Sequence, residues 1–181
     1  VKAVQLPFDL KNKELKLSLP TLLNYRPITL RHPKIKAIFK IEEEIINSFR
    51  RTMKDLDFTE FQAPTIVPVA TEGGAELFHI DYYDYDAYLA QSPQLYKQIM
   101  VGIFERVFTI TKAFRAEPSI TTRHLSEYTS LDIEMGFIES WEELMDICEI
   151  IIRNVFSDIQ KKYQRELKIF EAIIPKLSEK I

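Results

Sequence analysis

The spacing of apolar residues predicts one long amphipathic helix in the first third of the chain. From about residue 33 to residue 56, apolar side chains recur every three or four positions, and lysine, glutamate and arginine side chains fill the positions between them. This period matches the apolar stripe of an α-helix that packs on one side. Residues 1–32, which precede it, read as extended and irregular, with turn-forming residues at Asn24 and Pro27.

The pattern then changes to short β-type runs. Residues 58–69, FTEFQAPTIVPV, read as a strand interrupted by prolines, which suits a sheet edge or an interface. Residues 77–90, LFHIDYYDYDAYLA, hold two aromatic-rich runs around Asp84–Asp86 and predict a hairpin. The pair Ser92–Pro93 supplies an N-cap and a first-turn proline for a helix over residues 93–104.

Two longer β-type segments and a second long helix complete the pattern. Residues 106–116 and 130–138 read as strands on either side of the polar stretch 117–129. Ser140 and Glu143 match a capping box, so we expect a helix from there to about residue 165. Because helices and strands do not alternate regularly, an α+β fold with an antiparallel sheet flanked by helices is favoured over a doubly wound parallel sheet.

Composition limits what the chain can be. With 181 residues, of which 46% are hydrophobic, it can bury one sizeable core, and we expect a single domain. No apolar run approaches the ~20 residues of a membrane-spanning helix, and the first residues lack the apolar core of a signal peptide, so we expect a cytoplasmic protein. The formal charge of -3 gives no global basic field for nucleic acid. We expect the lone Cys148 to be a buried thiol, and the three histidines lie too far apart in sequence for a zinc motif.

Strand periodicity places several charged residues on common faces. Residues two apart on a strand point the same way, so Arg115 shares a face with Glu117, and Asp132 shares a face with Glu134. Neighbouring antiparallel strands would bring the arginine and the three carboxylates onto one surface. A solvated sheet face with cross-strand ion pairs explains this pattern equally well.

Three further motifs suggest a ligand site only when they are taken together. Glu72 directly precedes Gly73–Gly74, so the backbone could approach a ligand while the carboxylate binds an amino group; paired glycines alone usually mark a tight turn. Gln94 and Lys97 are three apart and share a helix face. The pair Arg123–His124 offers donors suited to phosphate oxygens. Each motif alone also fits an ordinary surface or turn.

Taken in order, three segments resemble the archaeal and eukaryotic aspartyl type of class II aminoacyl-tRNA synthetase. They are EGGAELF, AYLAQSPQLYKQ and FRAEPSITTRHLSEYTSLDIEM, and the likeness extends over about residues 20–155. FRAE followed by RHL is similar to the second class II motif, and QSPQLYKQ marks the aspartate branch. The long helix and the segment FTEFQAPTI that follows it resemble the first motif, whose proline matches Pro64. Asp57 stands where the family usually has glycine. The resemblance implies an aspartate–tRNA ligase that forms a homodimer through residues 33–69.

The resemblance also implies a role for each matching residue. Arg115 would hold the α-phosphate of ATP and stabilise the charge that develops when the aspartate carboxylate attacks phosphorus. Tyr128 would stack under the adenine, and His124 would lie near the terminal phosphates. Contacts with ATP are implied for Arg115, Ala116, Glu117, Arg123, His124, Leu125 and Tyr128. Contacts with L-aspartate are implied for Glu72, Gln94, Leu95, Tyr96, Lys97, Arg115 and Asp132. Among the latter, the α-amino group would be received by Glu72, Gln94 and Asp132.

Lys97 is the residue implied to select the amino acid. An ammonium group there favours an aspartate carboxylate over a neutral amide, because a charge-assisted hydrogen bond is worth about 1.5–3 kcal/mol. The implied nucleic-acid partner is tRNA(Asp), and use of tRNA(Asn) as well stays open.

Two parts of the family pattern have no counterpart in the sequence. Nothing before Val1 represents the anticodon-binding barrel, and no glycine follows Gly136, whereas the third class II motif is glycine-rich. Mg²⁺ is expected as well, but its usual ligands would lie beyond this chain, and no metal ligand is identifiable within it. We therefore expect residues 1–181 to be a partial catalytic domain, incomplete at the C-terminus, that forms little adenylate alone. The alternatives are a paralogue that makes asparagine without tRNA and a non-catalytic binding or regulatory module.

Overall fold

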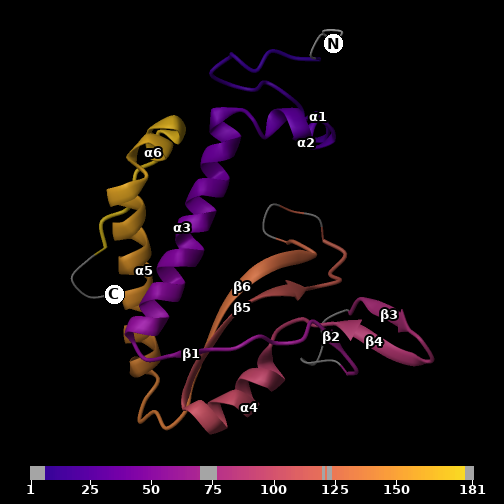
Figure 1. Ribbon diagram of the computed structural model, residues 1–181, viewed down its shortest axis with the longest axis vertical. Coiled ribbons are helices and arrows are strands. Elements are labelled where there is room, and N and C mark those ends of the chain that lie inside the picture. Colours follow the sequence, from indigo (N-terminus) through magenta and orange to yellow (C-terminus); the bar gives the residue numbers. More distant parts are fainter. Residues whose placement is uncertain (1–6, 70–76, 120, 122–123, 178–181) are drawn as a thin grey trace, which may run out of the picture. The chain divides into compact units, whose positions relative to one another are not determined.

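The chain forms two compact units (Figure 1). The computed structural model describes residues 7–69, 77–119, 121 and 124–177. One unit comprises residues 1–48 and 152–181, and the other comprises residues 49–151. The boundary between them falls within the long helices α3 (Pro33–Asp55) and α5 (Glu142–Lys162), so each unit contains part of both. Helix α3 confirms the long amphipathic helix predicted from the apolar spacing.

Two short helices open the first unit, which corrects the expectation that residues 1–32 are irregular. Helix α1 (Leu19–Asn24) begins after Ser18, whose side-chain oxygen accepts a hydrogen bond from the Thr21 backbone N–H. Helix α2 (Arg26–Thr29) follows it. Each has a proline in its first turn, where a missing N–H removes no helical hydrogen bond. Of the two residues that we interpreted as turn formers, Pro27 lies in the first turn of α2 and Asn24 is the last residue of α1.

Polar contacts join the parts of α3 and α5 that lie in the first unit. The Ser48 hydroxyl donates to Asp158 Oδ2 at 2.7 Å, and Lys162 Nζ lies 2.8 Å from Glu44 Oε1. The Glu44 carboxylate is buried, so its ion pair with Lys162 is needed to offset the loss of hydration.

Helix α5 confirms the helix predicted from the capping box, with different limits. Glu143 Oε1 accepts a hydrogen bond from the Ser140 backbone N–H at 3.4 Å, and a separate helix, α6 (Gln164–Phe170), follows α5. Cys148 is exposed, so the prediction of a buried thiol is wrong. The buried residues of α5 recur at helical spacing, and Cys148 lies one residue away from their stripe. These buried residues are Ile147, Val155 and Ile159.

The larger sheet of the second unit has the strand order β1–β5–β6 in the described residues. Strands β5 (Arg106–Phe114) and β6 (Glu127–Met135) form a long antiparallel ladder, which is the paired ribbon in Figure 1. The short strand β1 (Thr59–Glu60) pairs with β5 in parallel. The α+β class with an antiparallel sheet is thus confirmed, and this one short parallel pair is the departure from it.

The second sheet contains the predicted hairpin. Strands β3 (His79–Tyr82) and β4 (Tyr85–Leu89) pair antiparallel around a turn at Tyr83–Asp84, and β2 (Ile66–Val67) pairs with β4. Beyond β4, the Phe114 backbone N–H donates to the Ala90 carbonyl at 3.0 Å. This bond brings the chain that leads into the next helix beside the end of β5.

Helix α4 (Gln94–Phe104) confirms the helix expected after Ser92–Pro93. It begins one residue later than predicted, with Pro93 in the cap position. The Ser92 hydroxyl still accepts a hydrogen bond from the Gln94 backbone N–H at 3.2 Å, as an N-terminal cap does. This hydrogen bond stabilises the start of α4 at Gln94, and the position of the helix start determines the direction of the side chains in the first turn.

The core of the second unit lies against one face of the β5–β6 ladder. Phe108 on β5 is fully buried, and its ring meets the Phe49 ring edge to face at 5.7 Å between centroids. The buried cluster consists of Phe49, Met53, Phe58, Phe108 and Ile147. Partly buried residues packed against it include Ile110, Leu131, Ile133 and Met135. The side chains between these positions therefore project from the opposite face.

Candidate active site on the polar face of the ladder

The second face of the β5–β6 ladder carries hydroxyl and charged side chains. Thr109 lies directly opposite Asp132, and Thr111 lies opposite Ser130. Facing residues on neighbouring strands project from the same side of the sheet, and positions two apart share that side. The face opposite the core therefore carries a row of polar groups. The row consists of Thr109, Thr111, Tyr128, Ser130, Asp132 and Glu134.

A buried lysine from α4 reaches this face. Lys97 is 8% exposed, and its Nζ lies 3.1 Å from Asp132 Oδ1 and 3.5 Å from Glu134 Oε2. One ammonium group thus meets two carboxylates, and the cluster has a formal charge of one negative unit. An ammonium carries three N–H donors, so Lys97 retains capacity for a further acceptor while both carboxylates are bound. The cluster can receive a ligand that presents a carboxylate and an ammonium group together.

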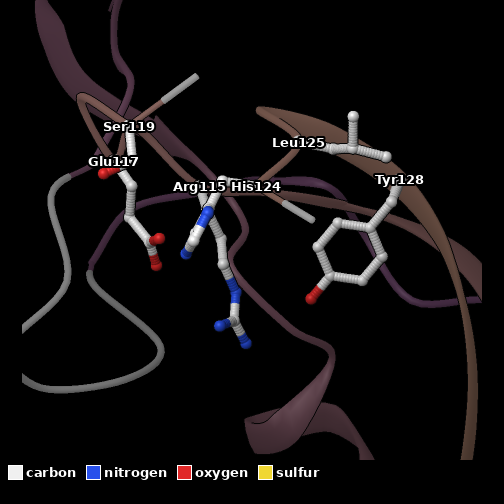
Figure 2. Close-up of a pocket in the computed structure, with 6 residues that line it drawn as sticks. All are labelled: Arg115, Glu117, Ser119, His124, Leu125 and Tyr128. Atoms are coloured by element: carbon white, nitrogen blue, oxygen red, sulfur yellow. The ribbon is translucent and has the colours of Figure 1, made fainter. Parts of the chain in front are cut away.

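A pocket of about 430 Å³ lies where the polar face meets the chain beyond β5 (Figure 2). Its lining residues are Arg115, Glu117, Ser119, His124, Leu125 and Tyr128. The Arg115 guanidinium carbon lies 5.9 Å from the centroid of the Tyr128 ring. Figure 2 shows the Arg115 side chain extending between Glu117 and Tyr128. Guanidinium and imidazole groups beside a phenol ring suit a ligand that combines anionic oxygens with a flat aromatic ring.

Hydrogen bonds hold the frame of this pocket. The Arg115 backbone N–H donates to the Ser126 carbonyl at 3.0 Å, which continues the ladder contact beyond the end of β5. His124 Nδ1 lies 2.7 Å from Thr121 Oγ1, so one ring nitrogen of the imidazole is engaged. The Nε atom of Arg115 is buried and has no hydrogen-bond partner in the part of the chain that the structure describes. The guanidinium group therefore retains donors for a ligand.

The predicted ATP-site residues are mostly brought together. Five of them line the one pocket: Arg115, Glu117, His124, Leu125 and Tyr128. Ala116 is half-buried and follows Arg115 without lining the pocket. Arg123 lies outside the described residues. The strand prediction for Arg115 and Glu117 is wrong in one respect, because β5 ends at Phe114.

The predicted aspartate-site residues are brought together in part. Lys97 and Asp132 are in direct contact. Gln94 and Tyr96 in the first turn of α4 are half-buried, whereas the Leu95 side chain is 41% exposed. Glu72 and the following glycine pair lie outside the described residues. We predicted one surface that joins an arginine with three carboxylates. The structure has two groups instead: Asp132 and Glu134 lie around Lys97, and Glu117 lines the pocket with Arg115.

Sequence reasoning missed three residues of this region. Ser119 lines the pocket beside Glu117. Thr109 and Gln91 are both 0% exposed, and their side-chain polar atoms have no hydrogen-bond partner within the described residues. The strand alternation could have placed Thr109 on the face of Asp132, had the pairing register been known. No sequence signal marks Gln91 as buried.

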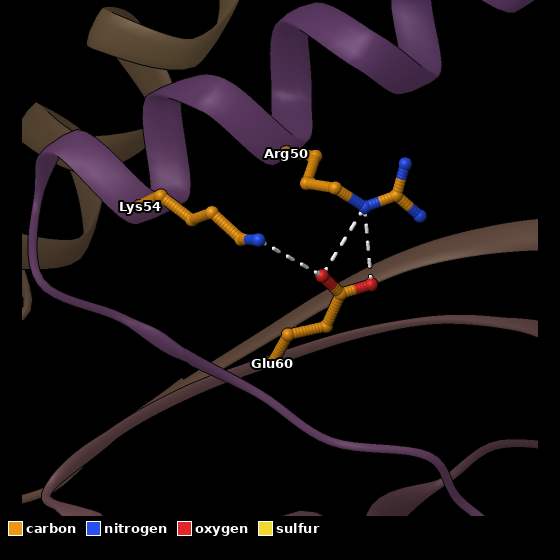
Figure 3. Close-up of polar contacts among 3 residues, drawn as sticks. All are labelled: Arg50, Lys54 and Glu60. Carbon is orange, nitrogen blue, oxygen red and sulfur yellow. Dashed lines mark hydrogen bonds and ion pairs between the residues drawn. The ribbon is translucent and has the colours of Figure 1, made fainter.

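An ion-pair group lies at the other edge of the same sheet (Figure 3). Arg50 Nε on α3 donates to both carboxylate oxygens of Glu60 on β1, at 3.1 and 3.2 Å. Lys54 Nζ lies 3.9 Å from the same carboxylate. Because β1 pairs with β5, this group ties the end of α3 to the strand next to the ladder.

The described residues contain neither a metal-binding group of side chains nor a membrane-spanning helix. Among the residues that the structure describes, no three histidine, cysteine, aspartate or glutamate side chains gather closely enough to hold a metal ion. No helix in the described ranges is both long enough and apolar enough to cross a membrane.

Comparison with known proteins gives the family. A sequence profile for tRNA synthetases class II (D, K and N) matches residues 18–180. Aspartate–tRNA(Asp/Asn) ligase of Deinococcus radiodurans is 44% identical over 93% of this chain and 39% of its own length. Aspartate–tRNA(Asp) ligase of Pyrococcus furiosus is 46% identical over 92% of this chain and 38% of its own length.

A solved structure agrees with these matches. Asparaginyl-tRNA synthetase from Pyrococcus horikoshii, complexed with asparaginyl-adenylate, superposes with a TM-score of 0.80 at 34% identity. The match covers 86% of this chain and 36% of that one. The chain thus spans about two fifths of the length of the curated relatives that it matches. With the family profile covering most of its residues, the chain belongs to the class II tRNA synthetases of the D, K and N group.

Proposed function

We propose that this chain supplies the part of an aspartate–tRNA ligase that binds L-aspartate and ATP and forms aspartyl-adenylate. The observation that carries the proposal is the buried Lys97 ammonium on the same ladder face as the Arg115 pocket. A cation that recognises a side-chain carboxylate and a guanidinium that recognises phosphate are the two charges that this reaction needs. The names of the relatives at 44% and 46% identity support the same activity.

The ATP half of the proposal rests on the chemistry of the pocket. Arg115 would bind the α-phosphate, because a guanidinium donates two parallel hydrogen bonds to phosphate oxygens. Tyr128 would stack on the adenine, and His124 would donate to the terminal phosphates. The remaining contacts are assigned to Ala116, Glu117, Arg123 and Leu125. Ser119 joins them, since it lines the same pocket.

The amino-acid half rests on the contacts of Lys97. Two of its three N–H donors face Asp132 and Glu134, and the third would bind the side-chain carboxylate of aspartate. Asp132 Oδ2 is buried without a partner among the described residues, and it would accept from the α-ammonium group. Glu72 and Gln94 would share that ammonium, and Leu95 and Tyr96 would shape the site.

These side chains would act mainly by positioning and electrostatics. Arg115 would neutralise charge on the α-phosphate as the carboxylate oxygen of the amino acid attacks phosphorus and pyrophosphate leaves. Lys97 and Asp132 would hold the two charged ends of the amino acid, so the attacking carboxylate would need little reorientation. Magnesium is expected with ATP, and no group of three described histidine, cysteine, aspartate or glutamate side chains would hold it as a resident ion.

Calorimetric titration with a non-hydrolysable aspartyl-adenylate analogue tests the proposal, with the asparaginyl analogue as the paired ligand. We expect the aspartyl analogue to bind about 10- to 150-fold more tightly, because one charge-assisted hydrogen bond is lost with the amide. Lys97→Ala should remove this preference while binding of the adenylate moiety persists. If neither analogue binds, the proposed function is wrong.

Asparagine activation is the second candidate, because the solved relative with a TM-score of 0.80 is an asparaginyl-tRNA synthetase. The same titration decides between the two. Tighter binding of the asparaginyl analogue by the unaltered chain would establish asparagine as the substrate and exclude the role given to Lys97.

The tRNA partner and the oligomer belong to the same proposal. We propose tRNA(Asp), with tRNA(Asn) as a second substrate to be tested by charging assays, since the relatives include enzymes named for both. A homodimer through residues 33–69 is supported by large apolar side chains that this segment exposes. They are Ile38, Phe39, Ile66 and Val69, which are 48–55% exposed.

Light scattering tests the homodimer. Phe39→Glu should give a monomer if α3 lies in the interface, because a carboxylate would be buried without a partner. Gln62→Glu is the matched control, since it adds the same charge within the segment without removing an apolar surface. A monomeric unaltered chain would refute the dimer and leave the ligand proposal untouched.

A further inference from the structure

Two buried polar groups face each other across the β5–β6 ladder without a hydrogen bond. Thr109 on β5 and Asp132 on β6 are paired in register, so their side chains project from the same face at neighbouring positions. Thr109 is 0% exposed, and its hydroxyl has no hydrogen-bond partner in the described residues. Asp132 Oδ2 is buried and likewise lacks a partner there. One group is a donor and the other is an acceptor.

This arrangement is unfavourable for the unliganded chain. A buried polar atom without a partner costs roughly 1–3 kcal/mol relative to one that is paired. Valine has nearly the shape of threonine and would fill position 109 without a hydroxyl, and it is also a good strand former. Packing and strand formation therefore do not explain the hydroxyl group of Thr109, which points to a role that needs a hydrogen bond.

The contacts of Asp132 indicate what that role is. Lys97 Nζ holds Oδ1 of the carboxylate at 3.1 Å, whereas no described group holds Oδ2. A carboxylate held by one oxygen can still rotate about its terminal bond. A ligand ammonium group that donates to Oδ2 needs this oxygen in a defined orientation, so a second anchor on the carboxylate improves binding by reducing the ordering that the ligand itself must impose.

We propose that Thr109 is a positioning residue for the amino-acid site. Its hydroxyl donates to Asp132 Oδ2 when a ligand is bound and holds the carboxylate where it receives the ligand's α-ammonium group. Oδ2 has capacity for both donors, because each carboxylate oxygen offers two lone pairs. This inference rests on the proposed function, since it assumes a ligand that carries an ammonium group.

The test pairs two variants with two ligands. The variants are Thr109→Val, which keeps the shape and removes the hydroxyl, and Thr109→Ser, which keeps the hydroxyl. The ligands are the aspartyl-adenylate analogue and the same molecule with hydrogen in place of the α-amino group. We expect Thr109→Val to weaken the first ligand about tenfold and the second less than about twofold, and Thr109→Ser to bind both like the unaltered chain.

A thermal melt of the unliganded variants separates positioning from packing. Thr109→Val should melt at the same temperature as the unaltered chain or higher, because an unpaired buried hydroxyl is replaced by a methyl group. Lower stability together with equal weakening of both ligands would assign Thr109 to packing and overturn the proposal. If Thr109→Val does not fold, Thr109→Ser and Thr109→Ala keep the ligand comparison available.

The outcomes also separate this inference from the proposed function. Suppose that the unaltered chain prefers the aspartyl analogue over the asparaginyl one. If Thr109→Val then binds the aspartyl analogue and its deaminated form as tightly as the unaltered chain binds them, only the role of Thr109 is wrong. If the unaltered chain binds neither ligand, the proposed function fails and the role of Thr109 fails with it. Selective loss of the ammonium-bearing ligand supports both.

Discussion

The two faces of the β5–β6 ladder are made by the same strands but have opposite properties. On one face, Phe108 and its neighbours pack into the core, and their apolar surface is removed from water. On the other face, Arg115 Nε, Asp132 Oδ2 and Thr109 Oγ1 are buried without hydrogen-bond partners in the described residues. The first face stabilises the fold, whereas the second contains unpaired buried polar atoms that cost stability. Because successive side chains of a strand project to opposite faces, the same two strands can carry both.

The largest expected effect is on the apolar face. Phe108→Ala should destabilise the chain by about 3–5 kcal/mol, because it removes a fully buried ring and leaves a cavity. Urea denaturation followed by circular dichroism measures this change. Residual folded protein should bind the aspartyl-adenylate analogue with unaltered affinity, and a selective loss of affinity would show that the two faces are not independent.

The complementary substitution is on the polar face. Arg115→Gln should change the unfolding free energy by less than about 1 kcal/mol, because the guanidinium Nε has no described partner to lose. The same variant should bind ATP about 10- to 150-fold more weakly, since a charged donor to phosphate is removed. Denaturation and calorimetry on one sample test both parts. Strong destabilisation by this substitution would contradict the division between the faces.

A smaller effect is expected at the sheet edge. Glu60→Gln removes the charge that Arg50 and Lys54 share, and it should cost about 1 kcal/mol or less, because these side chains are partly exposed. A double-mutant cycle with Arg50→Met isolates the pair, and the coupling should weaken in high salt. If salt leaves the coupling free energy unchanged, hydrogen bonding rather than charge attraction is its main source.

The smallest effect is expected in the first unit, which contains no residue of the ladder. Burial, followed by the Glu44 and Glu43 carboxylates, raises the pKa of Tyr163 above its usual value. The folded state therefore holds this proton more tightly than the unfolded state. Stability should fall as the pH rises above the unfolded value of about 10, and Tyr163→Phe should reduce that fall. Denaturation at pH 9 and at a higher pH compares the two proteins.

The long periodic elements were predictable from sequence, and the short ones were not. Helix α3 and the β5–β6 pair have strong hydrophobic periods that packing reinforces. The helices α1 and α2 are only six and four residues long, and their prolines favour turns and helix starts alike. Local composition could not separate these two outcomes.

The candidate site was predictable where spacing alone determines the face of a strand or helix. Asp132 and Glu134 share a face because they are two apart, and both contact Lys97. Thr109 needed more information, because its position opposite Asp132 depends on the pairing register of the two strands. Threonine is common in strands for its shape alone, so its hydroxyl gave no signal before that register was known.

The exposed thiol on α5 has a practical consequence. Cys148 is the chain's only cysteine, and it lies on the surface. A maleimide dye or spin label would therefore attach at one defined position without any substitution. The same thiol can also crosslink two copies by air oxidation. An apparent dimer in the absence of reductant would then report sulfur chemistry rather than association through α3.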